Sequence, residues 1–139
     1  MRTGLGPLNQ PLRCAPPAKA GHTALEGRWR ADLTGGALRA AGEPPEVIDR
    51  FRGRWQLEFR NGHWGARSLD SGVTIGGSYT VVGHRLRETV ESCKPPHGCQ
   101  KGSVAEDDWS VYRDRLSFTH IPGHYGTPAV TAQPWARVR

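Results

Sequence analysis

The dipeptide Asn61-Gly62 interrupts the alternating segment RWQLEFRNGHWGARSL and is the feature that most restricts how this chain can fold. Asparagine and glycine tolerate the positive φ angles of a two-residue type I′ turn, so the segment predicts a β-hairpin. Because residues pair outward from the turn, Phe59 is expected opposite Trp64. Leu57 is then expected opposite Ala66. One face of the hairpin is apolar and aromatic, and it must lie against a core.

Two further hairpins are predicted by the same reasoning. The segment GSYTVVGHRLRETVES turns near Gly83, and DWSVYRDRLSFTHI turns at Arg113-Asp114. Because side chains alternate between the faces of a strand, each hairpin gathers one set of residues on a common face. The first set is Tyr79, Val81, Leu86, Glu88 and Val90, and the second set is Trp109, Val111, Leu116 and Phe118. Successive hairpins of this kind form a meander.

Two more strands, GRWRADL and QPWARVR, complete a set of about eight. Between the first strand and the first hairpin, Thr34 is a suitable helix N-cap and Pro44-Pro45 can open a second short helix. Antiparallel strands joined in sequence order close readily into a barrel, which removes exposed edges. We therefore expect an all-β, antiparallel, eight-stranded up-and-down barrel with a short helical insert after the first strand. The alternative, a sandwich, needs longer crossovers than these loops provide.

One domain is expected, because 139 residues can bury one core of modest size. Residues 1–23 contain four prolines and no apolar periodicity, which predicts a disordered or linker tail. The barrel domain is then expected over residues 24–139. The tail lacks the apolar stretch of a signal peptide, so the chain is expected to be cytoplasmic if it is complete as given.

The net charge of +6 comes mostly from arginine residues spread along the chain. Binding to nucleic acid needs such charges gathered on one face, and no basic cluster is present in the sequence. No segment is apolar and long enough to span a membrane as a helix. We therefore expect no nucleic-acid partner and no membrane insertion.

The motif Gly27-Arg28-Trp29 on the first predicted strand resembles the G-x-W signature of the lipocalin and calycin superfamily. In that superfamily the tryptophan closes one end of the barrel beneath an arginine from the last strand. The resemblance therefore implies that Trp29 closes the barrel and that Arg137 or Arg139 lies over it, with Arg137 our choice.

A wider resemblance is carried by LRC in the tail and by the segments LEGRWRADLT, FRNGHWGARSLDSG, GSYTVVGHRL, ESCKPPHGC, WSVYRDRLSF and PWARVR. Together they resemble the lipocalin-like domain at the C-terminal end of certain bacterial solute-binding proteins, including proteins similar to the periplasmic component of TRAP-type dicarboxylate transporters. The resemblance implies an extracytoplasmic accessory domain with a transporter or solute-binding partner. The sequence does not contain solute-binding lobes, so a transport role does not carry over directly.

Cys93 and Cys99 flank a bend that contains Pro95-Pro96 and can bring their Cβ atoms into disulfide range. Because extracytoplasmic relatives fold in an oxidising space, the resemblance implies that these two cysteines form a disulfide. The alternative is a zinc site made by both cysteines and His97, for which no fourth ligand is evident. Cys14, in the tail, is expected to be a free thiol. We expect no metal and no cofactor.

No set of residues forms a catalytic constellation, and no catalytic residue is predicted. His120 and His124 have a ligand-like spacing, but Pro122 between them prevents the helix that would align their rings. These two histidines are therefore expected to be polar groups of a loop.

Glu88 is the exception, because strand alternation places it among inward-facing apolar side chains. A buried carboxylate must be paired or protonated. It is expected either to form a salt bridge with an arginine such as Arg137, to lie at a wet barrel mouth, or to anchor a ligand. The predicted ligand-binding residues are Phe59, Trp64, Tyr79, Glu88 and Trp109.

The predicted barrel and its inward-facing residues are compatible with two functional classes. The first is a non-catalytic binding or accessory domain that holds a small apolar or amphipathic ligand in the barrel. The second is a small barrel enzyme, such as a cyclase or isomerase of a hydrophobic biosynthetic intermediate, with Glu88 or Tyr79 as the acid-base group. Both need an open interior, whereas the many aromatic side chains could also fill it.

Overall fold

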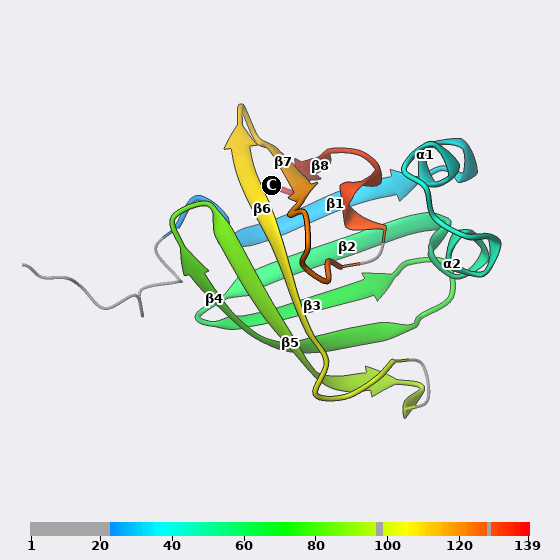
Figure 1. The fold of residues 1–139 in the computed structure, drawn as a ribbon, viewed down its shortest axis with the longest axis horizontal. Coiled ribbons are helices and arrows are strands. Elements are labelled where there is room, and N and C mark those ends of the chain that lie inside the picture. The colour runs from blue at the N-terminus through cyan, green and yellow to red at the C-terminus, as the bar shows by residue number, and fades with distance from the viewer. Residues whose placement is uncertain (1–22, 97–98, 128) are drawn as a thin grey trace, which may run out of the picture.

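The computed structural model describes residues 23–96, 99–127 and 129–139. Over these residues, eight strands form a closed antiparallel barrel in sequence order, with the last strand paired to the first (Figure 1). The predicted up-and-down barrel and its helical insert are confirmed. The predicted tail lies outside the described residues except for Thr23. None of the described helices has the length and apolar character needed to cross a membrane.

The elements have the following bounds. The strands are β1 (Gly27–Leu33), β2 (Gly53–Arg60), β3 (His63–Ser68), β4 (Thr74–Val82), β5 (Arg85–Lys94), β6 (Val104–Tyr112), β7 (Arg115–His120) and β8 (Trp135–Arg137). The helices are α1 (Gly35–Ala40), α2 (Pro45–Phe51) and the 3₁₀ helix η4 (Val130–Ala132).

The hairpins have the registers that their turns predict. The cross-strand pairs include Phe59 with Trp64, Tyr79 with Glu88, and Trp109 with Phe118. Asn61 and Gly62 have φ angles of 50° and 82°, as a type I′ turn requires. Arg113 and Asp114 have φ angles of 50° and 63°, so the β6–β7 turn uses the same conformation.

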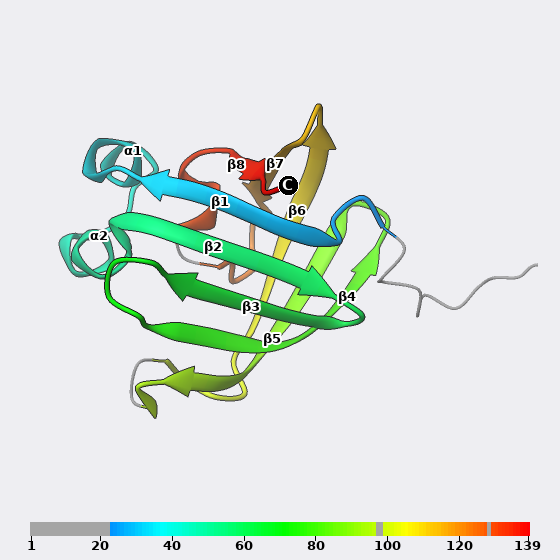
Figure 2. The same ribbon diagram turned by 180° about the vertical axis from the view of Figure 1, so that it is seen from behind.

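Helices α1 and α2 lie side by side at the end of the barrel where β1 ends and β2 begins (Figures 1 and 2). We call this the helical end. The Thr34 hydroxyl accepts a hydrogen bond from the Ala37 amide at 3.0 Å, which caps α1 as predicted. Pro45 is the first residue of α2. Leu38 and Ile48 are buried, so each helix contributes to the core.

At the opposite end the buried Trp29 packs against Arg137, and we call this the closed end. The Trp29 indole donates a hydrogen bond to the Leu25 carbonyl at 3.0 Å, and the Arg137 guanidinium carbon lies 4.2 Å from the centre of its ring system. The same guanidinium donates to the backbone oxygens of Ala24 and Glu26 and to the Asp114 carboxylate. A Cβ atom at Gly27 would lie 2.9 Å from the Arg137 guanidinium, so the glycine makes room for the arginine.

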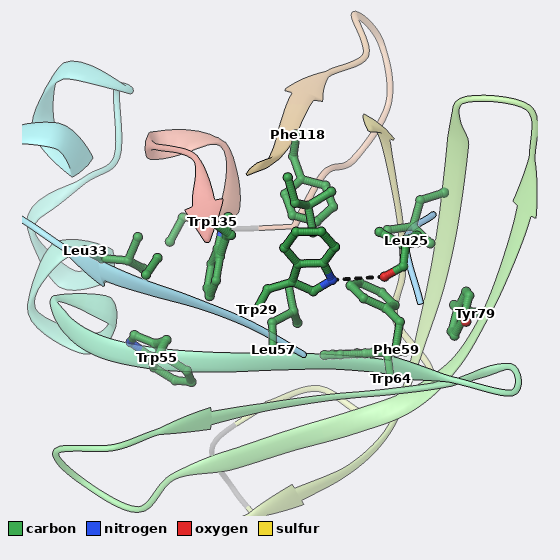
Figure 3. Packing of buried hydrophobic residues seen from close by; sticks show 14 of the residues in the cluster. Leu25, Trp29, Leu33, Trp55, Leu57, Phe59, Trp64, Tyr79, Phe118 and Trp135 are labelled. Atoms are coloured by element: carbon green, nitrogen blue, oxygen red, sulfur yellow. Dashed lines mark hydrogen bonds between the residues drawn. The ribbon is translucent and has the colours of Figure 1, made fainter. Parts of the chain in front are cut away.

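Buried side chains lie inside the barrel along its whole length, from the closed end to the helical end (Figure 3). Leu25, Phe59 and Tyr79 lie toward the closed end, and Leu33 and Trp55 lie toward the helical end. Packing is dense around Trp29, which has no solvent exposure. The space available to a ligand is therefore on the helical side of these rings.

Candidate functional site

A cavity of about 500 Å³ lies inside the barrel. Every strand contributes to its lining, together with α2, residues that follow β5, and the segment that follows β7. The volume is within the range of about 300–1,000 Å³ found for small-molecule sites. The interior is thus open rather than filled by its own aromatic side chains.

Three tryptophans, Trp55, Trp64 and Trp135, line the cavity. Each indole N–H is already used, because it donates to a backbone carbonyl. The acceptors are Phe51 at 2.9 Å, Thr89 at 3.2 Å and Val130 at 3.2 Å, respectively. With their N–H groups satisfied, the rings present apolar surface to the cavity.

Glu88 is the buried carboxyl group of this wall. It lies on β5 opposite Tyr79 and Ala105, is 5% exposed, and lines the cavity. The Thr127 hydroxyl donates a hydrogen bond to Oε1 at 2.8 Å. Burial, with a smaller contribution from the negative charge of Asp107, raises the pKa of Glu88 to about 7. The group can therefore donate or accept a proton near neutral pH.

The salt bridge considered from the sequence is not present. Arg137 pairs with Asp114 at the closed end, at 3.1 Å, and not with Glu88. Within the described part of the chain, no lysine, arginine or histidine forms an ion pair with Glu88. The interpretation of Glu88 as the partner of a structural arginine is therefore wrong, because Arg137 is held by Asp114 and by the backbone oxygens of Ala24 and Glu26.

A second carboxyl group, Asp107, lies behind Thr127. It is 2% exposed, and its Oδ2 accepts a hydrogen bond from the Thr127 amide at 3.1 Å. Its Oδ1 has no hydrogen-bond partner among the described residues. Burial raises the pKa of Asp107. The chain passes so close that a Cβ atom at Gly126 would lie 2.8 Å from Oδ1, which leaves room only for glycine there.

The segment that carries Thr127 crosses from β7 to β8, and we call its described residues, 121–127 and 129–134, the strap. The Glu106 amide donates to the Tyr125 carbonyl at 2.8 Å, and His124 Nδ1 lies 2.6 Å from the Glu106 carboxylate. The Ala129 amide donates to the Glu43 carboxylate at 2.9 Å. These contacts hold the strap against β6 and the segment between α1 and α2, with Thr127 over the cavity.

The structure divides the predicted ligand-binding residues into two groups. Trp64 and Glu88 line the cavity. Phe59 and Tyr79 pack edge to face, with ring centroids 5.1 Å apart, and neither lines the cavity. Trp109 is half-buried and is also outside the lining. Strand alternation identifies inward side chains, but it does not tell how far along the barrel each one lies.

Sequence reasoning missed several residues of this site. Trp55 and Trp135 were not among the predicted ligand-binding residues, although both are aromatic and lie on predicted strands. Thr127 gave no signal, because the strap has no periodic pattern. The acidic run of residues 106–108 predicts a solvated loop, which is wrong for Asp107, since it lies on β6 and is buried. Arg50 lines the cavity from α2, where a basic residue in the last turn of a short helix is unremarkable.

Cys93 and Cys99 form a disulfide, with Cα atoms 6.0 Å apart, as the family resemblance implied. Cys99 also lines the cavity. The alternative zinc site is not supported, because the two sulfur atoms are bonded to each other. His97 and Cys14 lie outside the described residues. Among the residues that are described, no group of three or more His, Cys, Asp or Glu side chains is arranged to hold a metal ion.

Comparisons with protein-family models, with curated proteins and with solved structures gave no significant match to this chain. The barrel is compatible with a lipocalin-like fold, and the Trp29–Arg137 contact at its closed end agrees with that description.

Proposed function

We propose that the protein binds a small apolar or amphipathic molecule inside the barrel without converting it, and that Glu88 anchors the polar end of that molecule. The cavity of about 500 Å³ carries this proposal. Its wall combines three indole rings with a buried carboxyl group. Extensive apolar surface with a few placed polar groups is the usual composition of a small-molecule site.

We also propose an extracytoplasmic location and an accessory role beside a transporter or solute-binding protein. The disulfide between Cys93 and Cys99 supports the location, because such bonds persist in oxidising compartments. The partner is supported by the sequence resemblance alone. Alkylation of thiols in intact cells before lysis tests the location: the two cysteines should be protected, and their labelling would count against it.

A titration with the uncharged fluorescent dye N-phenyl-1-naphthylamine tests the binding proposal. The wild-type protein should bind the dye with energy transfer from the tryptophans of the wall. Ala66→Phe places a phenyl ring in the cavity and should weaken dye binding by about tenfold or more, since it removes the space in which apolar surface is buried. Ala136→Phe makes the same change at an exposed position of β8 and is the matched control.

The dye affinity of the control should equal that of the wild type. Near-UV circular dichroism checks that all three proteins are folded. Equal dye binding by Ala66→Phe and wild type would show that the dye lies elsewhere. Absence of binding by a folded wild-type protein would contradict the proposal.

A second candidate function is acid-base catalysis on a bound hydrophobic substrate, favoured by the pKa of about 7 for Glu88. Tyr79 is less suited to this role because it does not line the cavity. Native mass spectrometry of the purified protein would detect a co-purified molecule. Incubation of that molecule with wild type and with Glu88→Gln separates the functions: conversion by the wild type alone supports catalysis, and recovery unchanged from both supports binding.

A further inference from the structure

We propose that the bound molecule is an apolar amine whose ammonium group pairs with the Glu88 carboxylate inside the barrel. This inference rests on the proposed function and specifies its ligand class. It comes from the charges of the cavity, from the free acceptor position on Glu88, and from the indole N–H groups of the wall, which already donate to backbone carbonyls.

The two charged residues of the described cavity wall, Glu88 and Arg50, do not form an ion pair with each other. Glu88 is 5% exposed, and within the described residues it has no cationic partner. Arg50 also lines the cavity, but it is an exposed residue of α2 at the helical end. A buried carboxylate without a counter-charge is unfavourable. A ligand cation would supply the counter-charge that no described residue gives to Glu88.

Asp107 makes the same region still more favourable for a cation. It is 2% exposed, its Oδ1 lacks a hydrogen-bond partner among the described residues, and its charge acts on Glu88. The charged or titratable groups that act on Asp107 are His120 and Asp108. Because two carboxyl groups share this side of the barrel, a ligand carboxylate would be repelled from Glu88.

The hydrogen bonds of Glu88 leave a position for the ammonium group. Thr127 occupies Oε1, whereas Oε2 has no hydrogen bond within the described residues. The Thr127 hydroxyl is already donating, and the three indole N–H groups of the wall donate to backbone carbonyls. A ligand N–H can therefore bond to Oε2, while the rest of the ligand meets apolar surface.

The probes for this inference are 1-naphthylmethylamine, the size-matched alcohol 1-naphthylmethanol, and the anion 1-naphthoate, with affinities measured by calorimetry. At about pH 8, where Glu88 is ionised, the wild type should bind the amine about tenfold or more tightly than the alcohol, as for a charge-assisted hydrogen bond. It should bind the anion more weakly than the alcohol. Glu88→Gln should bind amine and alcohol about equally.

The pH dependence gives a readout that needs no variant. The amine stays protonated below about pH 9, whereas Glu88 loses its proton near pH 7. Affinity for the amine should therefore rise by about tenfold or more between about pH 5.5 and 8, while affinity for the alcohol changes little. Glu91→Gln, at an exposed position of the same strand, is the matched control and should behave as the wild type.

The outcomes separate this inference from the proposed function. If the alcohol or the anion binds the wild type as tightly as the amine does, the amine inference is wrong and the binding function stands. An amine preference that persists unchanged in Glu88→Gln would also overturn it. If none of the naphthyl compounds and no uncharged dye binds the folded protein, the proposed function itself is wrong.

Discussion

At the scale of single residues, the ionised Glu88 carboxylate destabilises the folded protein, and the same group has a proposed role in binding. Burial raises the pKa of Glu88 from its ordinary value of 4.5 to about 7, so the folded state binds the proton more tightly than the unfolded state. The protonated carboxyl group is compatible with an apolar wall, whereas the carboxylate needs a counter-charge. We propose that a bound ligand cation supplies that counter-charge.

The raised pKa predicts how stability depends on pH. The contribution of Glu88 to the free energy of unfolding is fully present below about pH 4.5 and is lost as pH rises through about 7. The loss amounts to about 3 kcal/mol. In urea unfolding, the free energy of unfolding of Glu88→Gln relative to that of the wild type should rise by about this amount as the pH increases from about 4 to 8. Parallel stability profiles of the two proteins would mean that Glu88 has an ordinary pKa.

Gly27 gives a second prediction at this scale. It has a φ angle of +134°, and a Cβ atom there would crowd the Arg137 guanidinium. Gly27→Ala should therefore lower the free energy of unfolding by about 1–3 kcal/mol. Gly36→Ala, in α1 with no atom within 4 Å of the added Cβ, should leave stability unchanged or raise it by up to about 1 kcal/mol. Similar effects of both substitutions on the denaturation midpoint would contradict this account of the closed end.

At the scale of elements, the hairpins could be predicted because their information is local. The Asn61-Gly62 turn and the alternation beside it determine both the register and the inward face of β2 and β3. The helices were also recognisable, from the Thr34 cap and from proline at the start of α2. Neither inference required contacts between residues distant in the sequence.

The strap could not be predicted, for the opposite reason. Thr127 contacts Glu88 across 39 positions of sequence, and Ala129 contacts Glu43 across 86. Such contacts leave no periodic signal. For the same reason strand alternation could not separate Trp64, at the cavity, from Phe59, in the packed core directly opposite it.

The bend between β5 and β6 gives a prediction at this scale. Three cysteines are present in the chain, and two of them, Cys93 and Cys99, are bonded to each other. Thiol labelling of the oxidised protein under denaturing, non-reducing conditions should count one free cysteine per chain. Reduction should lower the free energy of unfolding by roughly 2–3 kcal/mol, since it releases a constraint on the unfolded chain. A count of three would contradict the disulfide.

At the scale of the whole molecule, the barrel has two different ends. The closed end is packed around Trp29 and held by Arg137, whereas the helical end is bordered by α2 and the strap. The cavity lies between them, lined by every strand. The strap also positions the Thr127 hydroxyl on Glu88.

The most direct test of this account is a carbon-13 NMR titration of the Glu88 side-chain carboxyl group, assigned with Glu88→Gln, in the free protein and with saturating 1-naphthylmethylamine. We expect a pKa of about 7 for Glu88 in the free protein and a clear decrease when the amine is bound, because the ammonium group stabilises the carboxylate. An ordinary carboxyl pKa of about 4.3 in the free protein, unchanged by the amine, would contradict both the buried carboxyl group and its role in the cavity.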